Sequence, residues 1–278
     1  MTTKPKAPAQ QEQSDWTSSA SCLRCETLGR LFLAGWKPQE ERSAALNFGS
    51  AYHHMLELHY LSPLKPPTWD FLAQYTLTEE QIATLKTSLP AYLKAAAEYE
   101  IDPASCQETK PEARLSYGGW NAKVDQQLYK ADGIYFLEHK TSAYVPNINK
   151  VEHALVAEGQ ISGQLYLGKN LFGSDFNGVW YCPFAHRKQL LKPILVRPDA
   201  TRLAKFESDL ALYLAKQKKC RHTRPASLEK NRYACMDFNR PCDFYDHCWH
   251  DVPMTEQHFT KDHWEPGLGY SDMHNEVL

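Results

Sequence analysis

Three consecutive strand-like segments constrain the fold of this chain most strongly. They cover residues 112–116, 120–128 and 134–140. Between the last two, the pair Asp132–Gly133 is a typical signal for a tight β-hairpin turn. Helical patterns stand on both sides of this block, so we expect an α/β fold in which a mixed central sheet is flanked by helices.

The flanking helices are predicted from apolar residues that recur at intervals of three and four. A short buried-looking strand is expected at 178–184, after the fourth helix. The predicted helices cover residues 21–36, 43–60, 78–100, 153–172 and 198–218.

Composition and hydropathy place the chain among ordinary water-soluble proteins. Of its 278 residues, 42% are hydrophobic and 23% are charged. No apolar run approaches the roughly 18–20 residues of a membrane span, and the first residues lack a secretory apolar core. We expect a cytoplasmic protein without membrane contact. Its predicted parts are a disordered leader (1–15), one domain (16–250) and a C-terminal tail (251–278).

The eight cysteines are clustered in a way that favours metal ligation. In a reducing compartment a disulfide framework is not expected. Cys235, Cys242 and Cys248 fall within fourteen residues, and Cys22 and Cys25 lie close together near the start. Such clustering is more typical of a metal site than of scattered core thiols.

Two acids and a lysine stand on the predicted hairpin. Strand side chains alternate, so Glu138 and Lys140 should share a face. With Asp132 and Gly133 at the centre of the turn, Asp125 should lie opposite Lys140 and diagonal to Glu138. We therefore expect both carboxylates and the ammonium on one face of the sheet.

Carboxylate oxygens are the ligands that Mg²⁺ and Mn²⁺ prefer, so this pattern predicts a divalent-cation site. Such an ion can polarise a phosphoryl oxygen, and a lysine beside it can position the attacking water or stabilise the pentacovalent phosphate. The alternative is a surface hairpin in which Asp125 and Lys140 form an ordinary cross-strand pair.

The stretch from Asp125 to Lys140 resembles the central motifs of the PD-(D/E)XK nucleases, in their RecB-like branch. The resemblance implies a restriction-endonuclease-like fold. Upstream, Gly49-Ser-Ala-Tyr-His53 is similar to the helix from which that branch donates a metal-binding histidine, with His54 as the neighbour that could be confused with it. The implied ligands are His53, Asp125, Glu138 and the backbone carbonyl of His139.

The same branch has a helix carrying a glutamine followed four residues later by a tyrosine, next to the active site. Here Gln160, Gln164 and Tyr166 occupy the corresponding region, but no tyrosine stands four residues after Gln160. The resemblance implies that these three residues contact DNA. The missing tyrosine is a departure from the pattern that weakens this assignment.

The cysteines extend the resemblance to the AddB-like subgroup and to the nucleases of CRISPR adaptation. That subgroup takes one cysteine from before the nuclease core and three from after it, and the four hold a [4Fe–4S] cluster. The implied ligands are Cys25, Cys235, Cys242 and Cys248, with a helical lobe clasped by the metal. Cys22 is the alternative fourth ligand, and structural Zn²⁺ is the alternative metal.

The function that the resemblance implies is a metal-dependent deoxyribonuclease acting as an exonuclease on DNA ends or single strands. Expected partners are DNA and a helicase or recombination protein. The basic segment from Lys216 to Arg232 could guide the strand, although such a segment can also be a solvated surface. Two other readings stay open: a non-catalytic DNA-binding or scaffold protein of the same fold, and a zinc-stabilised enzyme acting on RNA.

Overall fold

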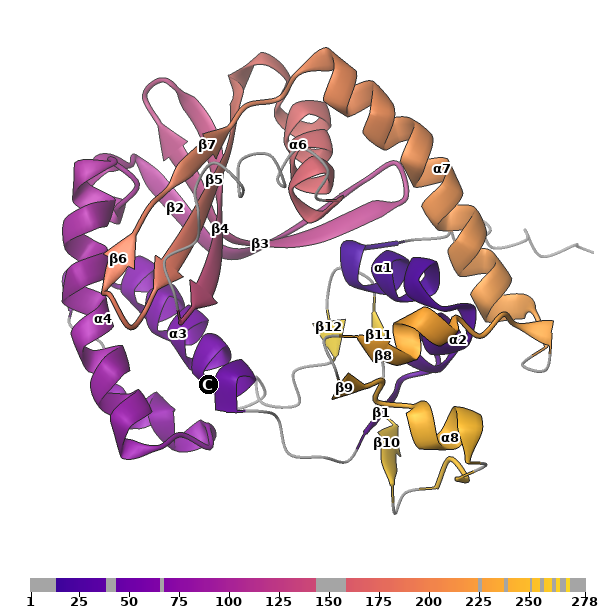
Figure 1. Cartoon of the computed structure of the whole chain (residues 1–278). Coiled ribbons are helices and arrows are strands. Elements are labelled where there is room, and N and C mark those ends of the chain that lie inside the picture. Colours follow the sequence, from indigo (N-terminus) through magenta and orange to yellow (C-terminus); the bar gives the residue numbers. More distant parts are fainter. Residues whose placement is uncertain are drawn as a thin grey trace, which may run out of the picture.

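A six-stranded mixed sheet forms the centre of the computed structural model (Figure 1). The order is β2-β3-β4-β5-β6, with β7 also pairing with β5; β4 and β5 run parallel, and the other pairs are antiparallel. The strands are β2 (Glu108–Tyr117), β3 (Trp120–Lys130), β4 (Gly133–Ser142), β5 (Phe176–Ala185), β6 (Leu190–Leu191) and β7 (Ile194–Val196).

The structure describes residues 14–38, 44–65, 68–143, 159–224, 227–237, 240–250, 252–255, 258–261, 264–265 and 269–270. The predicted leader lies outside these residues except for its last two, and so does the start of the helix expected at 153–172.

Helices cover both faces of the sheet, which confirms the predicted α/β architecture. Figure 1 shows α3 and α4 on one side and α6 on the other, with α7 beyond it. The long helices are α3 (Ala44–Leu61), α4 (Glu79–Glu98), α6 (Gly159–Phe172) and α7 (Ala200–His222). None of the helices in the described ranges has the length and apolar character needed to cross a bilayer.

Each face of the sheet has its own apolar core. Tyr52 and Met55 of α3 pack with Leu137 of β4 in the first core. On the opposite face, Phe136 of β4 packs with Ile161 of α6 in the second. Neighbouring residues of β4 thus point to opposite sides, as a strand requires.

The hairpin turn differs from the prediction by one residue. Lys130 pairs with Gly133, so the turn is centred on Ala131 and Asp132 and not on Asp132 and Gly133. Gly133 has φ 141°, and Asn177 of β5 donates to the Asp132 carbonyl at 2.5 Å. The contact with β5 therefore holds Gly133 in the strand, where its conformation excludes most other residues.

The shifted register changes what stands opposite the acid on β3. The β3–β4 pairing ends at Gln126 and Leu137, and its continuation brings Asp125 opposite Glu138. The expectation that Asp125 lies opposite Lys140 is therefore wrong. The shift moves the register by an even number of residues, so it does not by itself exchange the faces of the strand.

An irregularity in β2 and β3 does exchange the faces. Leu128 belongs to the first core and Val124 to the second, although an even spacing would place both on one face of a regular strand. Between them, Glu112 of β2 has φ 52°, and neither Glu112 nor Asp125 takes part in the paired register. The expectation of one common face for Asp125, Glu138 and Lys140 fails at this point.

The helix expected at 21–36 is two helices, α1 (Trp16–Arg24) and α2 (Glu26–Leu33). Cys25 separates them with an extended backbone, φ −161° and ψ 127°. The helices cross closely because Gly29 has no side chain, and a Cβ there would lie 2.6 Å from the Cys22 Sγ. The break gives Cys25 a direction that one continuous helix would not provide.

The C-terminal residues return to these two helices (Figure 1). Strand β10 pairs antiparallel with β1, which follows α2, and α8 lies nearby. The elements of this lobe are β1 (Trp36–Pro38), β8 (Met236–Asp237), β9 (Arg240–Pro241), α8 (Tyr245–Trp249), β10 (Phe259–Lys261), β11 (Trp264–Glu265) and β12 (Gly269–Tyr270).

A buried carboxylate joins this lobe to α7. Glu26 accepts from the Nζ atoms of Lys216 and Lys219, each at 2.6 Å, and from the backbone N–H of Glu229 at 3.1 Å. Burial alone would raise the pKa of Glu26, but the two ammonium groups and the backbone donor lower it to about 2.

Replacing Glu26 by glutamine should lower the free energy of unfolding by about 1–3 kcal/mol near neutral pH, because charged hydrogen bonds are lost. The folded-state pKa of about 2 lies below the ordinary value of 4.5. The contribution is therefore complete above the ordinary pKa and disappears as the pH falls toward the folded one.

Thermal unfolding at a series of pH values from neutral to acid tests this. The difference between wild type and Glu26→Gln should shrink with acid, while Glu207→Gln, on the exposed side of α7, should match wild type throughout. A Glu26→Gln deficit that stays constant across the series would contradict the ionic role.

Candidate active site

Helix α3 brings His53 to the end of the β3–β4 pairing. Its Nδ1 lies 3.2 Å from Asp125 Oδ1. Close packing of α3 on β4 is possible because Gly49, one turn earlier, would otherwise place a Cβ 3.3 Å from Thr141 Oγ1. Burial lowers the pKa of His53, but the adjacent carboxylate outweighs it, so the pKa is raised.

Asp125 binds the backbone of β4 where the two strands separate. The His139 N–H donates to Asp125 Oδ2 at 2.6 Å, and the ring Nδ1 of His139 lies 3.4 Å from the same oxygen. Burial would raise the pKa of Asp125, but His53 and the His139 contacts hold it well below its ordinary value. The carboxylate is therefore ionised at neutral pH.

A chain of buried hydrogen bonds supports Asp125 from behind. The Nε2 atom of His139 lies 2.9 Å from the Tyr92 hydroxyl, which lies 2.9 Å from the Tyr60 hydroxyl. Tyr60 in turn donates to the Ile101 carbonyl. Burial lowers the pKa of His139, which favours a neutral ring in this chain. Three elements, α3, α4 and β4, are thereby fixed around one carboxylate.

Glu138 is turned toward α6 and is only 2% exposed. Its Oε1 accepts from Lys140 Nζ at 2.5 Å and from Gln160 Nε2 at 2.7 Å, and its Oε2 accepts from Gln164 Nε2 at 2.7 Å. Lys140 also donates to Gln160 Oε1 at 3.0 Å. Burial and the nearby negative charge of Asp125 raise the pKa of Glu138.

These donors fit a hard divalent cation. The charges of Asp125 and Glu138 repel each other, and a bound divalent cation would offset this repulsion. The Oε1 atom of Gln164 is buried and has no hydrogen-bond partner within the described part of the chain. Among those same residues, however, no three His, Cys, Asp or Glu side chains already stand in a ligating arrangement. The oxygens of Glu138 are instead occupied by the donors from Lys140, Gln160 and Gln164.

The structure separates the other predicted residues from this group. His54 lies 3.1 Å from the Tyr75 hydroxyl through its Nδ1, away from Asp125. Tyr166 is 6% exposed and belongs to a third apolar core with Phe206. Of the three residues expected to contact DNA, only Gln160 and Gln164 therefore lie beside Glu138.

Sequence reasoning missed Tyr92 and Tyr60. Both lie on helices at positions that look like ordinary core aromatics, and both are buried in the first core. Apolar spacing in the sequence does not indicate whether the hydroxyl of a buried tyrosine forms a hydrogen bond with another helix or strand. Only the packing of α3 and α4 against β4 reveals it.

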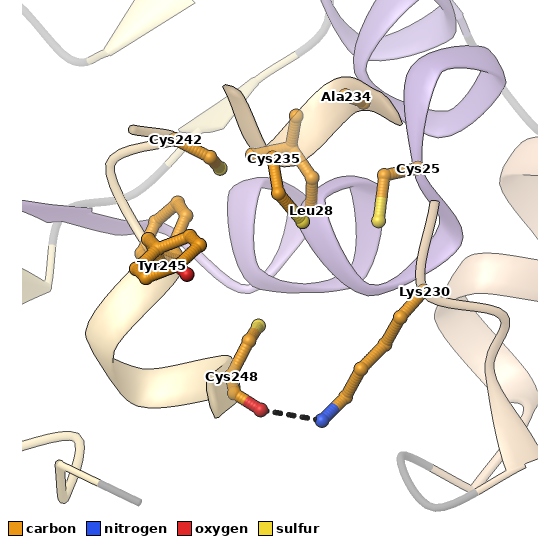
Figure 2. Close-up of a pocket in the computed structure, with 9 residues that line it drawn as sticks. Cys25, Leu28, Lys230, Ala234, Cys235, Cys242, Tyr245 and Cys248 are labelled. Carbon is orange, nitrogen blue, oxygen red and sulfur yellow. Dashed lines mark hydrogen bonds between the residues drawn. The ribbon is translucent and has the colours of Figure 1, made fainter. Parts of the chain in front are cut away.

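Four cysteines surround one pocket at the other end of the chain. Figure 2 shows Cys25, Cys235, Cys242 and Cys248 around a common space, with Leu28 also lining it. Cys22, the alternative fourth residue, is instead buried against Cys220. The extended residue between α1 and α2 thus meets three residues from the C-terminal segment.

The chemistry of these thiols fits a metal group. Burial raises the pKa of Cys248 to about 11, and the neighbouring cysteines of the pocket add to this effect. Burial also raises the pKa of Cys242. Burial thus keeps Cys242 and Cys248 protonated, and a bound cationic centre would reverse that preference, although no three cysteines of the described residues already stand in a ligating arrangement. Trp249 adds a donor, with its Nε1 3.3 Å from Cys235 Sγ.

The fold resembles that of a solved structure, a candidate exonuclease from Eubacterium rectale. The match has a TM-score of 0.51, covers 92% of this chain and 96% of that chain, and has 13% sequence identity. A second solved structure, SSO0001, matches over 63% of this chain and 78% of that chain at 11% identity. Its TM-score of 0.24 is too low to indicate a shared fold. No family model matches the chain, and no curated protein matches its sequence.

At this level of identity the likeness shows a shared fold and nothing about chemistry. The class that fold and site define together is a mixed α/β protein with two acids, a histidine and a partly exposed lysine at the end of a central hairpin.

Replacing Tyr92 by phenylalanine should lower the free energy of unfolding by about 1–3 kcal/mol, since the buried His139 nitrogen loses its partner. The matched control is Tyr52→Phe, because the Tyr52 hydroxyl is buried without a partner among the described residues. That change should be neutral or stabilising. Chemical denaturation of both variants measures the difference, and equal stabilities would remove the proposed support of Asp125.

Proposed function

We propose that this protein is a metal-dependent deoxyribonuclease that hydrolyses phosphodiester bonds, acting as an exonuclease on DNA ends or single strands. The observation that carries the proposal is that two pairs, His53 with Asp125 and Lys140 with Glu138, lie where β3 leaves β4, close enough for the charge of Asp125 to raise the pKa of Glu138. The nuclease-like fold supports it. The sequence resemblance to the RecB-like branch supports the same residues in the same roles.

His53, Asp125, Glu138 and the carbonyl of His139 are the residues that would hold Mg²⁺ or Mn²⁺. When bound, the cation would supply Lewis-acid polarisation of a phosphoryl oxygen and stabilise the leaving group. Asp125 contributes a carboxylate that is ionised at neutral pH. The Tyr92–His139 contact keeps that carboxylate in one orientation, so little reorganisation is needed when substrate binds.

Lys140 is the residue best suited to meet the scissile phosphate. Its side chain is 43% exposed, while the Glu138 that it contacts is buried. The ammonium can exchange its contact with Glu138 for one with a phosphate oxygen or with the attacking water. Gln160 bonds to both residues and so positions the ammonium relative to the carboxylate.

Lys140→Ala and Glu138→Gln should each reduce Mg²⁺- or Mn²⁺-dependent degradation of end-labelled DNA by at least about 10²-fold, because each removes a group that stabilises charge in the transition state. Circular dichroism and thermal unfolding should show that the variants are folded. The matched control is Lys130→Ala, a lysine of the same hairpin that contacts Glu100, and it should keep full activity.

Undiminished cleavage by both active-site variants would overturn the mechanism. Salt-sensitive DNA binding without turnover of any DNA by the wild type would favour a non-catalytic DNA-binding protein instead.

We also propose that Cys25, Cys235, Cys242 and Cys248 hold a [4Fe–4S] cluster, with Zn²⁺ as the rival metal. The support is the common pocket of four thiols drawn from both ends of the chain. A tetrathiolate centre there would join α1 and α2 to the C-terminal segment, and the free energy of ligation would become free energy of folding.

Protein purified without oxygen should be brown and contain about four iron atoms per chain. Cys242→Ser should lose the colour and the iron, because it removes one thiolate, whereas Cys106→Ser, outside the pocket, should keep both. Elemental analysis and visible absorption give the measurement. Colourless protein with stoichiometric zinc would contradict the cluster and leave the proposed nuclease activity unaffected.

A further inference from the structure

A cationic and aromatic surface lies at the edge of the cysteine pocket, where Lys230 lines the pocket and Trp249 donates to Cys235 Sγ. It consists of Lys230, Arg232, Tyr233 and Trp249, from the segment after α7 and from α8. Figure 1 shows α8 on the lobe opposite the central sheet. We name these four residues the α8 platform.

Two positive charges of the platform are held over one ring. Lys230 Nζ lies 5.2 Å from the centroid of Trp249, and Arg232 Cζ lies 5.3 Å from it. Lys230 also donates to the Cys248 carbonyl at 2.6 Å, a contact drawn in Figure 2. These contacts fix both long side chains at the surface, where they remain exposed.

Tyr233 gives the platform an open aromatic face. Its side chain is 95% exposed, although it stands directly after Arg232. A ring that is open to water in this way is free to stack on a planar group of a partner. Tyr233 belongs to the same exposed segment of the chain as Lys230 and Arg232.

The charges here are not compensated as those nearby are. Lys216 and Lys219 of the same basic segment are bound by Glu26 inside the fold. Lys230 and Arg232 instead contact the neutral Trp249 ring and, for Lys230, the Cys248 carbonyl, so no carboxylate of the described residues is seen paired with either cation. An exposed tyrosine in the same segment as two such cations offers the two kinds of group that bind a single strand, a ring for an unstacked base and positive charge for phosphates.

We propose that the α8 platform binds single-stranded DNA, with phosphates on Lys230 and Arg232 and a base stacked on Tyr233. This inference names the substrate form of the nuclease proposed above and therefore rests on that function. The platform would hold the strand outside the active site, on the lobe that the cysteines stabilise.

The test measures binding of the full-length protein to labelled oligothymidine by fluorescence anisotropy, in EDTA so that no cleavage occurs. Tyr233→Ala should weaken binding by about tenfold, the loss expected for one stacked base. Tyr233→Phe keeps the ring and should bind like wild type. Tyr99→Ala, an exposed aromatic on the other lobe, is the matched control and should also bind normally.

The contribution of charge is tested by salt dependence. Arg232→Gln should reduce the slope of log K against log salt by about 0.7, the value for one phosphate contact on a single strand. Lys94→Ala, an exposed cation on α4, should leave the slope unchanged. Duplex DNA and RNA of equal length provide the competing ligands, and single-stranded DNA should bind most tightly.

The proposal is overturned if Tyr233→Ala binds like wild type, if Tyr233→Phe is as weak as Tyr233→Ala, or if the duplex or the RNA binds more tightly than single-stranded DNA. Loss of binding in Tyr233→Ala supports the platform even if no DNA is ever cleaved. Unchanged binding together with normal cleavage would remove the platform alone, so its failure and that of the nuclease are distinguishable.

Discussion

The bond between the Asp125 carboxylate and the His139 N–H is the contact on which the site depends. Where β3 leaves β4, that N–H would lose its partner in the sheet, and an unsatisfied buried donor costs about 1–3 kcal/mol. Asp125 replaces the missing strand carbonyl with a charged oxygen at 2.6 Å. Its other oxygen faces His53, so one side chain both ends the hairpin ladder and joins α3 to it.

The same arrangement gives two nearby acids opposite properties. Asp125 is surrounded by imidazoles and an N–H donor, which lower its pKa, whereas burial and the charge of Asp125 raise the pKa of Glu138. Lys140 and two glutamines offset part of that cost. The proposed divalent cation would have to displace these donors from Glu138, and the proposed nuclease chemistry depends on that exchange.

The cysteine lobe shows how residues far apart in the chain can depend on one buried charge. Glu26 follows Cys25 directly, and its contacts with Lys216 and Lys219 fix α2 against α7. Cys25 is thereby held at the pocket that the C-terminal cysteines complete. The proposed metal centre and the proposed DNA-binding platform lie on this one lobe, so loss of the metal would also affect the surface beside it.

The sequence by itself determined the central strands and most of the helices, because apolar periodicity and turn-forming pairs are local properties. It could not determine the register or the facing of Asp125. Gly133 is held in β4 by Asn177 of β5, and the side chains of β3 exchange faces beside Glu112 of β2. The support from Tyr92 and the break at Cys25 were equally inaccessible. These features depend on contacts between segments distant in sequence, which no local pattern encodes and only the folded structure can decide.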